Sequence, residues 1–326
     1  MNPEAPRSAP MTRPRTIFFG SPEFAVPSLA RVAADSELVA VVTQPDRPAG
    51  RGRELAEPAV KRAARAHDPA LPILQPEKIR TPEFEATLRA FGADLFIVVA
   101  YGRILPQALL DVPGRGPINV HASLLPKLRG AAPIQWSIIN GDAEAGVSIM
   151  RMEAGLDTGP VCAQSSLPIG DDDTGETLAR RLAVLGAELL SSQLPRLATG
   201  TAVFTPQDDA HATLAPILRK EDGRLDFTQT ARAVSARARG VDPWPGATAL
   251  LDGQVVKLFG PRPLPGDATM VDAPPGTVIA IDSTGAAIAC GDRSLTFAEL
   301  QLPGRKRLPA AAVAAGRAIA PGARFG

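Results

Sequence analysis

The chain has 326 residues, of which 45% are hydrophobic and 21% are charged, and its formal net charge is +1. This length suits two domains, and the composition excludes a disordered chain and a strongly basic nucleic-acid binder. The two cysteines lie far apart in sequence, so we expect neither a disulfide framework nor a thiolate zinc site. With no targeting segment and no apolar run of about 18 residues, we expect a cytoplasmic protein without a membrane partner.

The first part of the chain alternates short apolar segments with amphipathic ones. The predicted strands are residues 16–20, 38–44, 71–75, 94–102 and 118–122. The predicted helices between them are residues 23–35, 58–67 and 81–92, where apolar residues recur every three or four positions. Alternating strands and helices predict an α/β fold with a doubly wound, Rossmann-like parallel sheet.

The later part of the chain has a different pattern. A long helix is predicted from Thr174, its candidate N-cap, to Gly200, and a shorter one over 231–240. Short apolar runs separated by glycine and aspartate turns then predict a small C-terminal β-barrel or sandwich. The predicted segments are a disordered extension (1–14), an α/β domain (15–200), a linker (201–222) and a β domain (223–326). Either Met1 or Met11 could be the start, and we expect the first ten residues to be dispensable.

Several common catalytic motifs are absent. The first strand–helix junction, "FFGSPEFA", lacks G-x-G-x-x-G, and no G-K-[ST] phosphate loop occurs. Neither H-E-x-x-H nor G-x-S-x-G is present. Nicotinamide, nucleoside-triphosphate, metalloprotease and common serine-hydrolase readings therefore lose support.

Asn119 and His121 follow two residues apart at the end of a predicted strand. Ligands of open α/β sheets bind beyond the carboxyl ends of the strands, and positions two apart share one face. An imidazole there can accept a proton from an amine, and an asparagine amide can stabilise an oxyanion. A lone histidine on a strand is more often a hydrogen-bonded core residue, so the motif needs further support.

Asp157 supplies that support if the fold brings it near His121. It lies with Thr158 in the glycine-flanked loop "MEAGLDTGP". Aspartate between glycines most often forms a turn. Beside His121, however, its carboxylate would orient the ring and stabilise the imidazolium.

An arginine-rich loop follows the second predicted strand. Arg47, Arg51 and Arg53 lie in "TQPDRPAGRGREL". Such a loop is commonly a solvated surface, but guanidinium groups on a glycine-bearing segment also suit phosphate binding.

At these residues the chain resembles the folate-dependent formyltransferase family. The shared set is Asn119, His121 and Asp157 together with the loop "SLLP" (123–126). The segments "TQPDRPAGRG" and "GAAPIQWSIINGD" are similar to the branch that acts on methionyl-tRNA, and so is a β-rich C-terminal domain after a linker. The linker departs from that branch, with Leu214 and Ile217 where tyrosine and lysine are frequent.

The resemblance implies an activity: transfer of the formyl group of 10-formyltetrahydrofolate to the α-amine of methionyl initiator tRNA, by a monomer without a metal. It also implies a folate-binding formyltransferase domain at 15–200 and an OB-like tRNA-binding domain at 223–326. By carry-over, His121 accepts the amine proton, Asn119 supports the oxyanion and Asp157 positions the histidine. The implied folate-binding residues are Ser123, Leu124, Leu125, Pro126, Val99, Tyr101, Gly102, Ile104 and Leu105.

The implied tRNA-binding residues belong to two basic segments. After residue 292 the sequence contains six basic residues and one acidic residue, Glu299. The segment "PGRKRLP" is the loop expected to contact phosphates. The implied tRNA-binding residues are Arg47, Arg51, Arg53, Arg305, Lys306 and Arg307.

Three alternatives stay open. The same residues could formylate an amino-sugar nucleotide, or could activate water and hydrolyse 10-formyltetrahydrofolate. A non-catalytic RNA-binding protein with a decayed α/β domain would have little reason to keep Asn119, His121 and Asp157 together. Aromatic residues make up only 4% of the chain, so platforms for base stacking are not obvious.

Overall fold

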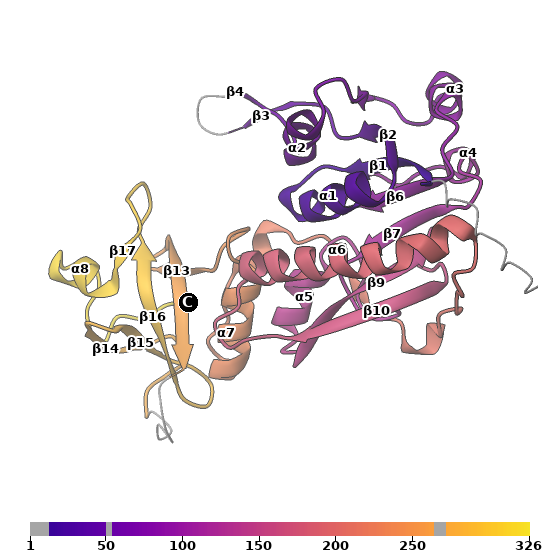
Figure 1. Ribbon diagram of the computed structural model, residues 1–326. Helices are drawn as coiled ribbons and strands as arrows, with labels where there is room; N and C mark the ends of the chain where they lie inside the picture. Colours follow the sequence, from indigo (N-terminus) through magenta and orange to yellow (C-terminus); the bar gives the residue numbers. More distant parts are fainter. Residues whose placement is uncertain (1–12, 50–53, 264–271) are drawn as a thin grey trace, which may run out of the picture. The chain divides into compact units, whose positions relative to one another are not determined.

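The computed structural model describes residues 13–49, 54–263 and 272–326. A seven-stranded sheet with the order β10-β9-β7-β6-β1-β2-β5 forms the centre of the first part (Figure 1). Its strands are β1 (Arg15–Gly20), β2 (Glu37–Val42), β5 (Ile73–Leu74), β6 (Leu95–Val99), β7 (Pro117–His121), β9 (Glu144–Arg151) and β10 (Val161–Pro168). The five strands predicted from the apolar runs are confirmed.

Helices cover both faces of this sheet. They are α1 (Val26–Asp35), α2 (Ala59–His67), α3 (Pro82–Ala90), α4 (Gln107–Leu110) and α6 (Gly175–Thr199). Phe18 of β1 packs in a cluster with residues of α1, α2 and α6, whereas its neighbours Ile17 and Phe19 pack with residues of α3 and α4. Successive side chains of a strand point to opposite faces, so this division identifies a doubly wound sheet and confirms the predicted class.

The sheet is mixed rather than wholly parallel. Strands β5, β2, β1, β6 and β7 pair in parallel, but β9 runs antiparallel to β7, with His121 opposite Ser148. The connection from β7 to β9 contains helix α5 (Pro133–Ile139), which groups with the C-terminal part of the chain. Without a helix returning across the sheet, the next strand can add in the antiparallel direction.

The C-terminal part contains an antiparallel sheet with the order β12-β13-β16-β15-β14, and β17 pairs with β16. Its core includes Leu258, Phe297 and Leu300, packed with Val234 of α7. The predicted β-rich C-terminal architecture is therefore confirmed. The elements are α7 (Ala231–Gly240), β12 (Thr248–Leu251), β13 (Gln254–Pro263), β14 (Val278–Asp282), β15 (Gly285–Ala289), β16 (Ser294–Gln301), β17 (Leu308–Pro309) and α8 (Ala310–Ala315).

Helix α6 begins and ends close to its predicted limits. The N–H of Thr177 donates to Thr174 Oγ1 at 3.3 Å, the contact expected of an N-cap, and Gly200 has a φ of 72°. Among the described residues, no helix has both the length and the apolar character that crossing a membrane requires.

The remaining elements are short. They are β3 (Arg47–Ala49), β4 (Glu54–Ala56), β8 (Arg129–Gly130), β11 (Leu214–Ala215) and the 3-10 helices η1 (Glu23–Ala25), η2 (Asp209–His211) and η3 (Lys220–Gly223). Strands β3 and β4 form a hairpin of their own, and β8 pairs with β11. Most of the predicted extension 1–14 lies outside the described residues.

Two compact units share the chain in an interleaved way. One comprises the described residues up to Pro126 with 146–165 and 182–211. The other comprises 127–145, 166–181 and the described residues from 212 onward. The division into contiguous domains at 15–200 and 223–326, joined by a linker at 201–222, stays a prediction.

Candidate active site

Strand β7 presents Asn119 and His121 on the same face of the sheet. Its alternate residues, Ile118 and Val120, pack in the cluster under α1, α2 and α6. Alternation therefore directs Asn119 and His121 to the opposite face. The His121 side chain is only 6% exposed, and that of Asn119 is partly exposed. The two-residue spacing thus places an amide and an imidazole next to each other at the end of a central strand.

Asp157 lies beside His121, which is the arrangement that the family resemblance implies. Its Oδ2 is 3.7 Å from His121 Nδ1, within the range of an ion pair but longer than a good hydrogen bond. The φ of Asp157 is 52°, in the left-handed region, which aspartate tolerates better than most residues. The loop therefore holds a carboxylate where it can stabilise a positive charge on the imidazole.

Gln207 ties down the loop that carries Asp157. Its Nε2 donates to the carbonyl oxygens of Asp157 and Gly159, each at 2.7 Å. Any other residue at position 159 would force the backbone to move, because a Cβ there would lie 1.9 Å from the Arg151 carbonyl oxygen. No local pattern singles out Gln207, which lies 50 residues from Asp157 in the segment predicted as a linker.

Ser148 and Gln164 hold the 123–126 loop beside the histidine. Ser148 Oγ donates to the carbonyl of Ser123 at 2.6 Å and accepts from the N–H of Leu125 at 3.1 Å. Gln164 Nε2 donates to Ser148 Oγ and to the Leu125 carbonyl, each at 2.8 Å. The fully buried Ser148 hydroxyl therefore uses its proton and both lone pairs. Neither residue was predicted from the sequence, although Ser148 is a polar position within an apolar strand.

The carboxyl edge of the sheet, defined here as the ends of β1, β6 and β7, also includes residues 99–105. Ala100 and Gly102 have φ values of 48° and 80°, so the backbone turns sharply just after β6. The Tyr101 carbonyl accepts from Gln44 Nε2 at 3.0 Å and from Ser21 Oγ at 3.4 Å. The connections leaving β1 and β6 run to opposite faces of the sheet, so this segment lies at the topological switch point.

The predicted folate-binding side chains differ in exposure. Val99, Tyr101 and Leu105 are buried, while Ile104 is 67% exposed. The Tyr101 hydroxyl is buried without a hydrogen-bond partner among the described residues, and burial raises the pKa of this phenol. Unpaired buried donors are rare in folded proteins, so this hydroxyl marks a place where a polar group of a ligand or a water can bind.

The basic residues predicted to bind tRNA lie in the β3–β4 segment and in the C-terminal unit, and two of them are not described. Arg47 is exposed on β3, whereas Arg51 and Arg53 lie outside the described residues. In the C-terminal unit, Arg305, Lys306 and Arg307 are all exposed. Arg307 donates to Glu299 and lies 4.1 Å above the Phe259 ring, so part of its charge is neutralised within the protein.

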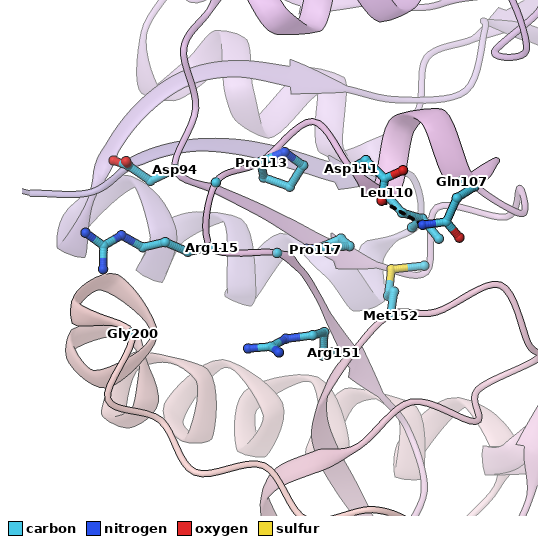
Figure 2. A pocket seen from close by; sticks show the side chains of 12 residues that line it. Asp94, Gln107, Leu110, Asp111, Pro113, Arg115, Pro117, Arg151, Met152 and Gly200 are labelled. Carbon is cyan, nitrogen blue, oxygen red and sulfur yellow. Dashed lines mark hydrogen bonds between the residues drawn. The ribbon is translucent and has the colours of Figure 1, made fainter.

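A cavity of about 860 Å³ lies at the opposite edge of the sheet, near the amino ends of β6 and β7 (Figure 2). Figure 2 shows Arg115 and Arg151 reaching toward the end of α6 at Gly200. None of the predicted site residues lines this cavity. Its volume therefore does not identify the catalytic position. No cluster of three or more metal-ligating residues occurs within 13–49, 54–263 and 272–326.

Comparisons with known proteins agree with this geometry. The profile of the formyl transferase family matches residues 15–194, and that of the formyl transferase C-terminal domain matches residues 217–318. Two relatives carry the name methionyl-tRNA formyltransferase. The one from Thiobacillus denitrificans is 50% identical over 96% of this chain and 99% of its own, and the one from Citrifermentans bemidjiense is 47% identical over 97% and 98%.

Solved structures share the fold at low sequence identity. WlaRD, a sugar 3N-formyl transferase studied with dTDP and 5-N-formyl-THF, aligns with a TM-score of 0.64 and 16% identity, over 91% of this chain and 100% of its own. HypX from Aquifex aeolicus in complex with tetrahydrofolic acid aligns with a TM-score of 0.63 and 18% identity, over 93% of this chain and 47% of its own. The match of both family profiles and of full-length relatives shows that the chain belongs to the formyl transferase family.

Proposed function

We propose that this protein transfers the formyl group of 10-formyltetrahydrofolate to the α-amine of methionyl initiator tRNA, giving formyl-methionyl-tRNA and tetrahydrofolate. The observation that carries the proposal is the convergence of Asn119, His121 and Asp157 at the carboxyl edge. It is supported by full-length relatives with 47–50% identity that are named for this activity.

In this proposal the chemistry is a direct transfer between two bound substrates. The amine nitrogen bonds to the formyl carbon and the bond from that carbon to N10 breaks. His121 accepts the amine proton, and that proton can then pass to the departing nitrogen. Asn119 donates to the oxygen that becomes negative during the transfer, and Asp157 stabilises the charged imidazole.

Folate binding is assigned to residues 99–105 and 123–126. Two features fit a ligand there. The unpaired Tyr101 hydroxyl offers a donor, and the left-handed Ala100 is a strained conformation of the kind that clusters at functional sites. The hydrogen bonds from Ser148 and Gln164 would keep the 123–126 loop in one conformation as the folate binds.

Binding of tRNA is assigned to the basic residues that the sequence analysis names for it, which are five arginines and Lys306. Exposed cations suit phosphate groups, and the affinity should then fall as salt rises because counterions are released. A cytoplasmic location, a monomeric state and independence from metal stay predictions from the sequence.

The test is formyl transfer by the purified protein with methionyl initiator tRNA, methionyl elongator tRNA or no acceptor. Formyl-methionyl product confined to the initiator tRNA is the expected result. Release of formate without an acceptor would indicate a 10-formyltetrahydrofolate hydrolase instead. Absence of reaction in all three assays would contradict both readings, and amino-sugar nucleotides would be tested next.

A further inference from the structure

A buried lysine lies in α2, where the N–H of Val60 donates to the carbonyl of Ser21, just past the end of β1, at 3.3 Å. Lys61 of α2 has a side chain that is only 7% exposed. Its Nζ lies 2.5 Å from Asp46 Oδ2 and 3.0 Å from Glu57 Oε1. Lysine is almost never buried unless it is paired. The hydrogen bond to Asp46 raises the pKa of Lys61 against the opposing effect of burial, so the ammonium stays charged.

The two carboxylates flank the hairpin formed by β3 and β4. Asp46 immediately precedes β3, and Glu57 immediately follows β4. Each strand has three residues, and Arg47 pairs with Ala56 at the base. A two-stranded hairpin of this size has little stability of its own. The hairpin also has no strand pairing with the seven-stranded sheet among the described residues, so its orientation depends on contacts at its base.

A chain of hydrogen bonds continues from this base to the end of β6. Gln75 Nε2 donates to Asp46 Oδ1 at 2.7 Å and to the Gln44 carbonyl at 2.9 Å. Gln44 Nε2 then donates to the Tyr101 carbonyl, and Gln44 Oε1 accepts from Arg103 Nε at 3.2 Å. The base of the hairpin is thereby connected to the segment assigned to folate binding.

Stability alone does not explain this arrangement. A buried ion pair is often no more stabilising than apolar side chains of the same volume, since both charges lose their hydration. What the ammonium adds is a fixed link between two points of the backbone, one on each side of the hairpin. Asp46 and Glu57 both have a lowered pKa, chiefly from the hydrogen bond to Lys61, so both accept as carboxylates.

We propose that Lys61 is a positioning residue that fixes the β3–β4 hairpin, and with it the exposed Arg47, for binding of the tRNA acceptor. The inference rests on the proposed formyl transfer to methionyl-tRNA. Lys61 contacts neither substrate in this scheme. It acts through Asp46 and Glu57, and its loss leaves the hairpin free to adopt several orientations.

The test is a steady-state comparison of the full-length wild type with Lys61→Met. We expect KM for methionyl-tRNA to rise about 10-fold, equivalent to about 1.4 kcal/mol, while kcat and KM for the folate change less than about 2-fold. Lys61→Arg should restore most of the tRNA affinity, because a guanidinium can also bridge two carboxylates. If Lys61→Met does not fold, Asp46→Asn and Glu57→Gln each remove one side of the link and should show a smaller rise in the same constant.

A double-mutant cycle separates positioning from general loss of stability. In an Arg47→Ala background the Lys61→Met change should raise KM for tRNA less than it does alone, because both act through one hairpin. Arg89→Met is the matched control, since it removes an ion pair with Glu85 on α3 at 2.9 Å and should leave all constants unchanged.

The outcomes distinguish this inference from the proposed function. A wild type that formylates no methionyl-tRNA contradicts the proposed function itself. Two results with an active wild type overturn the positioning role. In one, the variants of Lys61, Asp46 and Glu57 keep the wild-type KM for tRNA. In the other, kcat falls and the KM values for tRNA and for the folate both rise. A selective rise in the KM for tRNA supports it.

Discussion

The two edges of the seven-stranded sheet differ in how their side chains are held. At the carboxyl edge, His121 is buried, Asp157 lies 3.7 Å away, and Ser148 is fully hydrogen-bonded. At the amino edge a cavity of about 860 Å³ is lined by Arg115 and Arg151, both of which are exposed. Catalysis depends on groups that are held in place before the reaction. The carboxyl edge is therefore the better candidate for the catalytic site, although the cavity lies at the amino edge.

The largest expected effect comes from removing the groups at the carboxyl edge. His121→Ala and Asn119→Ala should each lower kcat by at least about 10²-fold, because proton transfer or oxyanion stabilisation is lost. Folate binding, measured by fluorescence titration, should remain detectable. Arg115→Ala at the amino edge is the control and should keep wild-type turnover. Near wild-type turnover in either site variant would contradict the assignment.

A smaller loss should follow when the support of the 123–126 loop is removed. Ser148→Ala leaves the buried N–H of Leu125 and the amide of Gln164 each one partner short. We expect a loss of about 1–3 kcal/mol in the free energy of unfolding and a rise in KM for the folate. Chemical denaturation and initial rates measure the two effects. A stable variant with an unchanged KM for the folate would show that this loop needs no such support.

Arg51, which lies outside the described residues, is predicted to affect binding of the tRNA rather than of the folate. Arg51→Ala should raise KM for methionyl-tRNA several-fold, and should reduce the slope of log K against log salt by about 1 if the guanidinium contacts one phosphate. The measurement is KM at several salt concentrations, with folate titration as the control. Equal losses of tRNA and folate binding would indicate a structural role, and a flat salt response of the wild type would exclude phosphate contacts altogether.

The smallest effect concerns the two thiols, neither of which is among the predicted site residues. Burial raises the pKa of Cys162 to about 11 and that of Cys290 to about 12. Both groups therefore stay protonated near neutral pH, and iodoacetamide should leave activity unchanged. Because the folded pKa is the higher one, any stability they contribute is present below the pKa of the unfolded thiol, about 8.5, and is lost as the pH rises through the folded values. Rapid inactivation at neutral pH would show an accessible thiolate.

Local patterns predicted most of the elements but not their supports. The apolar runs identified β1, β2, β6 and β7, and the spacing of Asn119 and His121 placed both on one face. The antiparallel direction of β9 was not predictable, because it depends on where α5 packs and not on the residues of β9 itself. Gln207 and Gln164 were not predicted either, because each donates to backbone carbonyls far away in sequence.

The sequence by itself determined the class of fold, because that depends on short-range periodicity. Its resemblance to a known family, carried by short motifs, singled out the candidate catalytic residues. Only the tertiary structure decided that Asp157 meets His121, that Ser148 and Gln164 hold the 123–126 loop, and that Lys61 joins both sides of a hairpin. Those contacts link segments separated by other elements, and they form only after hydrophobic burial has fixed the register and faces of the sheet.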